Sequence, residues 1–524
     1  MRGSRFLLLV VFLCGMTTMA IEMSASRLIG EFFGSPLTIW AILIGMVMIY
    51  LTAGYTLGGR LADRRPEARY LYGLIGVAAF ATGLIPAVSR PLLDWAQRGL
   101  SGALVGFYVG ALVGVLALFS VPMILLGCVS PFAIRLAMQE VGQAGRTAGS
   151  IYALSSVGSI LGTLLPPFVT LPHLGVALTF YLFALLLLGV AAIGARRWPF
   201  YVMLLVVVVL LVLFLTGVWT GHRLPPAGTT LLHERDSTYN YIQVYQQGDS
   251  INLALNEGLA VHSIYSLRYV KTNDPNDLLT YGPWDQFLIA PFFAPGQTAT
   301  SFSTLCLIGS AAGTVPKQYG AIFGTQVHVD GVELDPQIAA VGREYFAMGK
   351  DEASGVLTVH IQDGRYYLTN APRQYDIVGV DAYRQPYIPY HLTTYEFFSE
   401  VRAHLNGNGV AVINVGHIDG DYRLVEAIAA TMNAVFPSVY LIDLPGVRVV
   451  NTIVVATVQP STMDDFLSNI AVLDHPTLRV VADYVTGQCN PRAWEGAGMV
   501  FTDDRAPIEL VVDQMILNYV QGRP

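Results

Sequence analysis

The sequence predicts two structurally different parts: an N-terminal bundle of membrane-spanning helices, and a C-terminal α/β domain that follows a small β-strand subdomain. Of the 524 residues, 53% are hydrophobic and only 13% are charged, whereas an ordinary soluble domain carries about 25% charged residues. Residues 1–222 have a net charge of +7, and the remaining residues have a net charge of −14. We therefore expect a transmembrane domain at 1–222, a strand subdomain at 223–295 and an α/β domain at 296–524.

Seven apolar runs in the first part are long enough to cross a bilayer, for which a helix needs about 20 residues. Six of them are Phe6–Ser26, Leu37–Gly59, Tyr70–Ser89, Gly149–Thr170, Leu174–Gly194 and Phe200–Trp219. The seventh lies between Arg98 and Arg135 and contains Pro122 and Pro131, so we expect either a broken helix or one span plus a re-entrant piece there. The best count is seven spans, and a split at Pro122 would give eight. The lipid bilayer is the expected partner of this part.

The arginines of this part are unequally divided between the two sides that seven spans would create. One side receives Arg27, Arg90, Arg98 and Arg223. The other side receives Arg2, Arg5, Arg60, Arg64, Arg65, Arg69, Arg135, Arg146, Arg196 and Arg197. Because loops rich in Lys and Arg stay in the cytoplasm, this bias places the N-terminus inside and the C-terminal part outside.

Beyond residue 230 the pattern changes to short strands. Tyr241–Tyr245 and Ile251–Leu255, joined through Gly248-Asp249, predict a small antiparallel unit. After Pro295, apolar strands alternate with helical stretches, which predicts a parallel sheet covered on both faces. The expected strands of this sheet are Leu305–Ile308, Val327–Val332, Leu357–Ile361, Asp376–Val380 and Val410–Asn414.

Small or acidic residues follow the first four of these strands, at the end where parallel sheets bind ligands. The first strand leads into a turn of small residues that would let a ligand approach the backbone. Glu333 lies 24 residues after Gly309, close to the spacing at which an acid binds a ribose diol. The candidate nucleoside-binding residues are Gly309, Ser310, Ala312, Gly313, Glu333, Asp335, Asp363 and Gly364. Asp381 follows the fourth strand.

From about Leu231 to Leu444 the sequence resembles the spermidine synthase family of polyamine aminopropyltransferases. The matching segments are Glu234-Arg235-Asp236-Ser237-Thr238-Tyr239-Asn240-Tyr241-Ile242, Leu255-Asn256-Glu257-Gly258, Tyr281, Val332-Glu333-Leu334-Asp335, Asp363-Gly364-Arg365, and Asp381 followed by Leu392-Thr393-Thr394-Tyr395-Glu396-Phe397-Phe398. The resemblance implies a Rossmann-like class I methyltransferase fold behind a small strand domain. The membrane part is similar to the multi-span domain of a bacterial branch of that family.

The resemblance also implies roles for individual residues. Glu333 would bind the ribose hydroxyls, Asp363 the adenine amino group, and Asp381 would accept the proton of an attacking amine. Substrate contacts would come from Tyr239, Asn240, Glu257, Tyr281, Tyr383 and Arg384. The donor would be S-adenosylmethionine or its decarboxylated form, and methylthioadenosine would leave. This reaction requires no metal, and we expect none.

The sequence departs from the family pattern at several places. Ala312 occupies the position of an acid that binds the amine of the donor, and Arg384 replaces a second acid that binds the polyamine. Asn240 replaces a glutamine, and Gly282 replaces a polar residue. A cation at Arg384 disfavours a diamine acceptor and favours a group with a carboxylate.

Three functions remain open on these observations. The first is a membrane-embedded transferase that moves a carbon group from an adenosyl sulfonium to an amine, with Asp236 or Glu257 binding a polyamine. The second is cyclising or lyase-type cleavage of intact S-adenosylmethionine without an acceptor. The third is a small-molecule transporter with a degenerate nucleoside-sensing domain.

The expected location is a bacterial inner membrane, crossed several times. S-adenosylmethionine is a cytosolic metabolite, so the chemistry places the catalytic domain in the cytoplasm, against the arginine bias. We expect the cytoplasmic side on chemical grounds. The net charge of −14 in the soluble part argues against a nucleic-acid partner, and a homodimer stays open.

Overall fold

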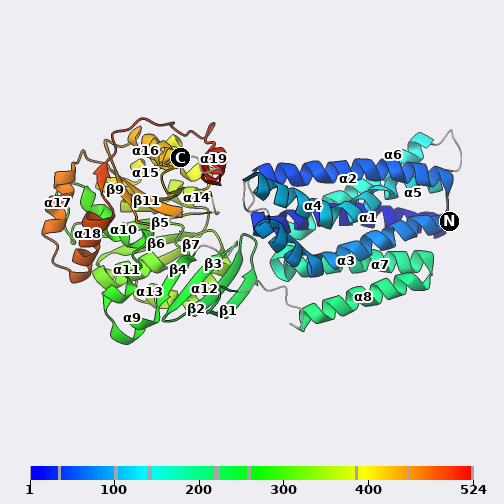
Figure 1. Ribbon diagram of the computed structural model, residues 1–524, viewed down its shortest axis with the longest axis horizontal. Helices are drawn as coiled ribbons and strands as arrows, with labels where there is room; N and C mark the ends of the chain where they lie inside the picture. Colours follow the sequence, from blue (N-terminus) through cyan, green and yellow to red (C-terminus); the bar gives the residue numbers. More distant parts are fainter. Residues whose placement is uncertain are drawn as a thin grey trace. The chain divides into compact units, whose positions relative to one another are not determined.

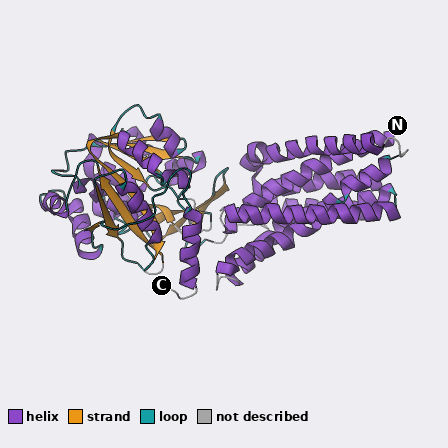
Figure 2. Cartoon of the chain, turned by 90° about the horizontal axis from the view of Figure 1, so that it is seen from above, coloured by secondary structure: helices purple, strands orange, loops and turns teal. Residues whose placement is uncertain are grey.

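The computed structural model describes residues 2–33, 37–99, 104–138, 144–216, 225–256, 261–383, 387–446 and 449–520. The chain divides into two compact units. One comprises Met1–Leu224 and Asp236–Thr238, and the other Pro225–Arg235 and Tyr239–Pro524. The boundary predicted after residue 222 falls in 217–224, outside the described residues. Figure 2 shows long helices in the first unit and strands together with helices in the second.

The first unit consists of apolar helices (Figure 1). They are α1 (Arg2–Phe33), α2 (Leu37–Arg64), α3 (Ala68–Gly99), α4 (Leu104–Gly127), α5 (Val129–Ala137), α6 (Ala144–Leu165), the π-helix η2 (Pro166–Thr170), α7 (Leu171–Ala195) and α8 (Trp198–Leu215). Within the described residues, six helical segments are long and apolar enough to cross a membrane. One of these, Ala144–Ala195, has 52 residues and contains both α6 and α7. Gly175 interrupts it with the non-helical angles φ 78° and ψ 179°. The count of seven spans stays a prediction.

The proline-containing run differs from its expected form. Pro122 lies inside α4, so the helix is not broken there. The interruption comes at Cys128, between α4 and α5, and Pro131 lies in the first turn of α5. Because α5 has only nine residues, it is too short to form a further span. The described helices therefore give no eighth span by a split at Pro122.

The second unit begins with a four-stranded sheet in the order β1-β2-β3-β4. Its strands are β1 (Thr230–Asp236), β2 (Tyr241–Gln247), β3 (Ser250–Leu255) and β4 (Val261–Ser266). The pairs β2–β3 and β3–β4 are antiparallel, which confirms the predicted hairpin and extends it by a strand on each side.

An eight-stranded sheet follows, in the order β12-β10-β11-β9-β8-β5-β6-β7. Its strands are β5 (Thr304–Ile308), β6 (His328–Glu333), β7 (Leu357–Ile361), β8 (Tyr375–Val380), β9 (Leu405–Ile418), β10 (Ser438–Asp443), β11 (Val449–Thr457) and β12 (Arg492–Ala493). The five predicted strands are all present as β5 to β9, and they pair in parallel. The pairs β9–β11, β10–β11 and β10–β12 are antiparallel.

Helices cover both faces of this sheet. Successive strand residues point to opposite sides, and in β5 the residues on each side are apolar and belong to a different core. Leu305 and Leu307 of β5 belong to the core under α10, α11, α17 and α18. Cys306 and Ile308 belong to the core under α14, α15, α16 and α19. The helices of this unit are α9 (Leu267–Thr272), α10 (Pro283–Ile289), α11 (Thr314–Phe323), α12 (Pro336–Tyr345), α13 (Met348–Ala353), α14 (Gly364–Thr369), α15 (Tyr395–Ala403), α16 (Arg423–Asn433), α17 (Met463–Ala471), α18 (Pro476–Gln488) and α19 (Ile508–Val520).

Candidate active site

The predicted nucleoside-binding residues gather at one edge of the large sheet. The neighbouring strands β8, β5, β6 and β7 are parallel, so their carboxyl ends meet at the same edge. Each of these four ends carries one of the predicted elements: the glycine turn after β5, Glu333 at the end of β6, Asp363 after β7 and Asp381 after β8.

The turn after β5 needs glycine at its first position. Gly309 has φ +86°, and its N–H donates to the carbonyl of Val332 at 2.9 Å. A Cβ atom there would lie 2.5 Å from the carbonyl oxygen of Asp381. Gly313, at φ +89°, precedes the first residue of α11. The turn therefore lies against the backbone that follows β8.

We expect Gly309→Ala to destabilise the second unit, because alanine resists this φ and its methyl group would collide with Asp381. Strain of this kind costs about 1–3 kcal/mol, which lowers the thermal midpoint by roughly 2–10 °C. Thermal unfolding of the purified full-length protein measures the change. Gly349→Ala is the matched control, because no atom lies within 4 Å of its Cβ position. Equal midpoints for both variants would contradict this account of the turn.

Three predicted residues of the turn, Ser310, Ala312 and Gly313, are buried. Ala312 is 1% exposed, and its N–H donates to the hydroxyl of Ser263 on β4 at 2.9 Å. Its methyl group packs in the core between the small sheet and α12. The Ser310 hydroxyl is buried and has no hydrogen-bond partner within the described part of the chain. The turn is thus fixed between both sheets of this unit.

Glu333 is directly bonded to the turn. One carboxylate oxygen accepts from the N–H of Ala311 at 3.0 Å, and the other accepts from the N–H of Asp335 at 2.9 Å. The side chain is 8% exposed, and burial raises the pKa of Glu333 to about 7. The N–H of Leu334 is a third backbone donor to this carboxylate. A carboxylate has about four acceptor positions, so one remains for a hydroxyl group.

Asp335 connects the two sheets. It caps α12 by accepting from the N–H of Gln337 at 3.0 Å, and its other oxygen accepts from the amide of Asn240 at 3.0 Å. The amide of Asn256 donates in turn to Asn240 at 3.0 Å. The predicted substrate residue Asn240 therefore lies beside the predicted nucleoside residue Asp335.

Asp363 caps α14, where it accepts from the N–H groups of Arg365 and Tyr366, both at 3.0 Å. Its second oxygen lies 3.2 Å from Nε2 of His391. The hydrogen bond from His391 is the main cause that lowers the pKa of Asp363 to about 2. The side chain is 43% exposed, so it is accessible to an amino group from solvent. Gly364 packs directly on β5, since a Cβ there would lie 2.2 Å from Ile308.

Asp381 directly follows β8, and the residue as a whole is partly exposed. One oxygen accepts from the indole N–H of Trp284 at 2.9 Å, and the other from the amide of Asn414 at 2.8 Å. Burial raises the pKa of Asp381 to about 6, although both hydrogen bonds oppose this rise. The carboxylate is therefore ionised at neutral pH and still basic enough to take a proton.

The sequence did not single out Trp284 and Asn414. Trp284 is 8% exposed in α10 and Asn414 is 4% exposed in β9. A tryptophan in a hydrophobic helix predicts core packing, and the asparagine ends a predicted strand without any motif around it. The pairing of β8 with β9 brings Asn414 to Asp381, and α10 brings Trp284 there.

The remaining predicted substrate residues differ in placement. Tyr383 donates its hydroxyl hydrogen to the carbonyl of Asn414 at 2.8 Å. Tyr239 and Tyr281 are 41% and 56% exposed, and the carbonyl of Tyr281 accepts from Tyr484 on α18. Glu257 and Arg384 lie outside the described residues.

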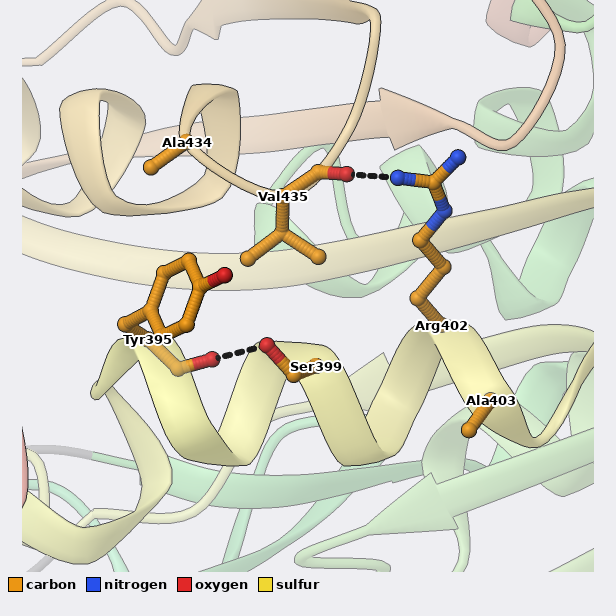
Figure 3. Close-up of a pocket in the computed structure, with 6 residues that line it drawn as sticks. All are labelled: Tyr395, Ser399, Arg402, Ala403, Ala434 and Val435. Atoms are coloured by element: carbon orange, nitrogen blue, oxygen red, sulfur yellow. Dashed lines mark hydrogen bonds between the residues drawn. The ribbon is translucent and has the colours of Figure 1, made fainter.

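A separate hollow is lined by residues of α15 and of the segment between α16 and β10. Figure 3 shows its lining from α15 and from the chain that enters β10. Ser399 donates to the carbonyl of Tyr395 at 2.7 Å, and Arg402 donates to the carbonyl of Val435. None of the candidate site residues lines this hollow. Among the described residues, no three His, Cys, Asp or Glu side chains are grouped so that they could hold a metal.

This chain is similar to several known proteins over part of its length. Residues 322–459 match the family model described as the spermine/spermidine synthase domain. A probable polyamine aminopropyl transferase of Bifidobacterium longum is 32% identical over 209 residues, which is 40% of this chain and 43% of that protein. A polyamine aminopropyltransferase of Vibrio vulnificus is 25% identical over 292 residues, 54% of this chain and 92% of that protein.

Among solved structures, a probable spermidine synthase from Corynebacterium glutamicum is 18% identical, with a TM-score of 0.38. The match covers 54% of this chain and 97% of the chain of that structure.

Proposed function

We propose, because residues 322–459 of this chain match the spermine/spermidine synthase domain, that the protein cleaves an adenosyl sulfonium and releases methylthioadenosine. The substrate is S-adenosylmethionine or its decarboxylated form, and an amine is the acceptor. The role of the protein is to hold the sulfonium, to orient the nucleophile and to take up one proton.

The main support is the arrangement around the glycine turn. On one side Glu333 bonds to the N–H of Ala311 at 3.0 Å. On the other side the backbone of Asp381 lies so close that only glycine fits at position 309. A nucleoside whose ribose binds Glu333 therefore has a basic carboxylate across the turn. Asp363, which follows β7, would accept from the adenine amino group, and its exposed side chain supports this role.

The chemical step follows from this placement. The amine nitrogen forms a bond to the carbon next to the sulfonium, the carbon–sulfur bond breaks, and its electron pair neutralises the sulfur. Methylthioadenosine then leaves as a neutral thioether and needs no acid. The proton released by the amine goes to Asp381.

Cleavage of intact S-adenosylmethionine without an external acceptor is the second candidate, and one observation favours it. At position 312, where the family has an acid that binds the amine of the donor, this chain has a buried methyl group. The amine or carboxylate of the methionine moiety would then act as the nucleophile, within the same molecule.

We expect purified full-length protein to release methylthioadenosine from at least one adenosyl sulfonium. The assay incubates the protein with S-adenosylmethionine or its decarboxylated form, each with and without putrescine. Release only from the decarboxylated donor with putrescine identifies the aminopropyl transfer, and release from S-adenosylmethionine alone identifies the cyclising or lyase reaction. A reaction without protein is the control, because it measures spontaneous breakdown of the sulfonium. If no combination releases methylthioadenosine, the proposed enzymatic activity is contradicted, and a nucleoside sensor attached to a transporter is favoured.

We further propose that the apolar helices cross a bacterial inner membrane and that the second unit lies in the cytoplasm, where adenosyl donors occur. Six apolar helical segments support the membrane location. A C-terminal reporter that is active only in the cytoplasm tests the side, and activity of a periplasm-specific reporter instead would contradict it.

A further inference from the structure

Both oxygens of the Asp381 carboxylate are occupied by side-chain donors from different elements. The indole N–H of Trp284 on α10 donates to one oxygen at 2.9 Å. The amide of Asn414 on β9 donates to the other at 2.8 Å. Both donors are buried. Two donors in different directions fix the plane of a carboxylate, while each oxygen keeps a further acceptor position.

The orientation of the Asn414 amide is itself fixed. Its carbonyl oxygen accepts from the amide of Asn451 on β11 at 2.8 Å, so its NH₂ group must face Asp381. The backbone beside it is held as well, because the Tyr383 hydroxyl donates to the carbonyl of Asn414 and accepts from the N–H of Gly416 at 2.5 Å. Three strands, β8, β9 and β11, are thereby linked behind one carboxylate.

The hydrogen bonds from Trp284 and Asn414 lower the pKa of Asp381, against the effect of burial. Burial favours the neutral acid, whereas hydrogen bonds donated to the carboxylate favour the ionised form. Of the described titratable side chains, Tyr383 interacts with Asp381, and both burial and this carboxylate raise the pKa of the Tyr383 hydroxyl. Tyr383 therefore stays neutral while Asp381 titrates.

We propose that Trp284 and Asn414, with Asn451 behind them, are positioning residues that aim the Asp381 carboxylate and keep it ready to accept a proton. This inference rests on the proposed function only for the identity of the proton donor. The geometry itself can be tested without turnover.

The test follows the Trp284 indole N–H by NMR in the full-length protein, labelled with ¹⁵N at its six tryptophan side chains. Trp284→Phe identifies the resonance. We expect the chemical shift of the Trp284 indole resonance to change with pH, with a midpoint near pH 6. Asp381→Asn should abolish the shift. Asn414→Asp replaces a donor by a like charge, so it should raise the midpoint by at least about one pH unit.

The second readout is the pH profile of methylthioadenosine release. A base acts only when it is deprotonated, so activity rises with pH through the pKa of Asp381. Removing the indole donor by Trp284→Phe should move this rise to higher pH by about one unit. Trp494→Phe is the matched control, because Trp494 follows β12, the outermost strand of the sheet and four strands away from β8. The pH profile of this variant should match that of the wild type.

The outcomes separate the two proposals. A Trp284 resonance that does not move with pH, or a midpoint that Asn414→Asp leaves unchanged, overturns the positioning role even if release is normal. A titrating resonance with the expected variant shifts supports it. If release is then absent in the wild type, the proposed function fails while the positioning of the carboxylate stands.

Discussion

Asp381→Asn should lower the turnover for methylthioadenosine release by about 10²- to 10⁴-fold, the contribution that a positioned base makes. Asparagine has the same shape, and its oxygen can still accept from Trp284 or Asn414. It cannot take a proton from the nucleophile. Steady-state kinetics at saturating donor measure the loss, and the Kd of methylthioadenosine should change by less than about threefold.

The pH dependence sharpens this prediction. Burial raises the pKa of Asp381 to about 6, so the turnover of the wild type at saturating donor should fall as pH decreases through this value. The small residual activity of Asp381→Asn should lack this fall. A variant with wild-type turnover, or one that keeps the same acid limb, would remove Asp381 from the role of base.

Glu333→Gln should weaken the binding of methylthioadenosine by roughly 10- to 100-fold, because a hydrogen bond to a charged group contributes about 1.5–3 kcal/mol and about 1.4 kcal/mol corresponds to a factor of ten. The ionised carboxylate of Glu333 has a free acceptor position beside the bonds from its three backbone donors. A glutamine has one oxygen only. Equilibrium dialysis with labelled methylthioadenosine measures the Kd.

Glu333 also predicts the pH dependence of binding. Burial raises its pKa to about 7, so the carboxylate is protonated below this pH and offers fewer acceptors to the ribose. Affinity should fall as pH decreases through about 7 in the wild type and stay level in Glu333→Gln. Glu352→Gln is the control, since Glu352 pairs with Arg343 on the surface. An equal loss in both variants would contradict ribose binding by Glu333.

The sequence could predict most of the second unit because its signals are local. Runs such as Leu305–Ile308 are apolar and end at glycine or an acid, so they identify both the strand and its end. Parallel pairing then brings the strand ends to one edge without further information. For this reason Glu333 and the glycine turn were predicted together, and they are directly hydrogen-bonded.

The supporting residues could not be predicted, because their roles depend on contacts between distant segments. Trp284 lies 97 residues before Asp381, and Asn414 lies 33 residues after it. Neither residue belongs to a local motif, and a buried tryptophan usually packs in a core. In the first unit, Pro122 indicated a break that the helix does not show, because α4 continues through it.

The most direct test of the central claim is equilibrium dialysis of labelled methylthioadenosine against the purified full-length protein. The account predicts saturable binding to one site per chain that S-adenosylmethionine or its decarboxylated form displaces. Absence of saturable binding at pH 8, where Glu333 is ionised, would contradict an adenosyl site at the edge of the sheet.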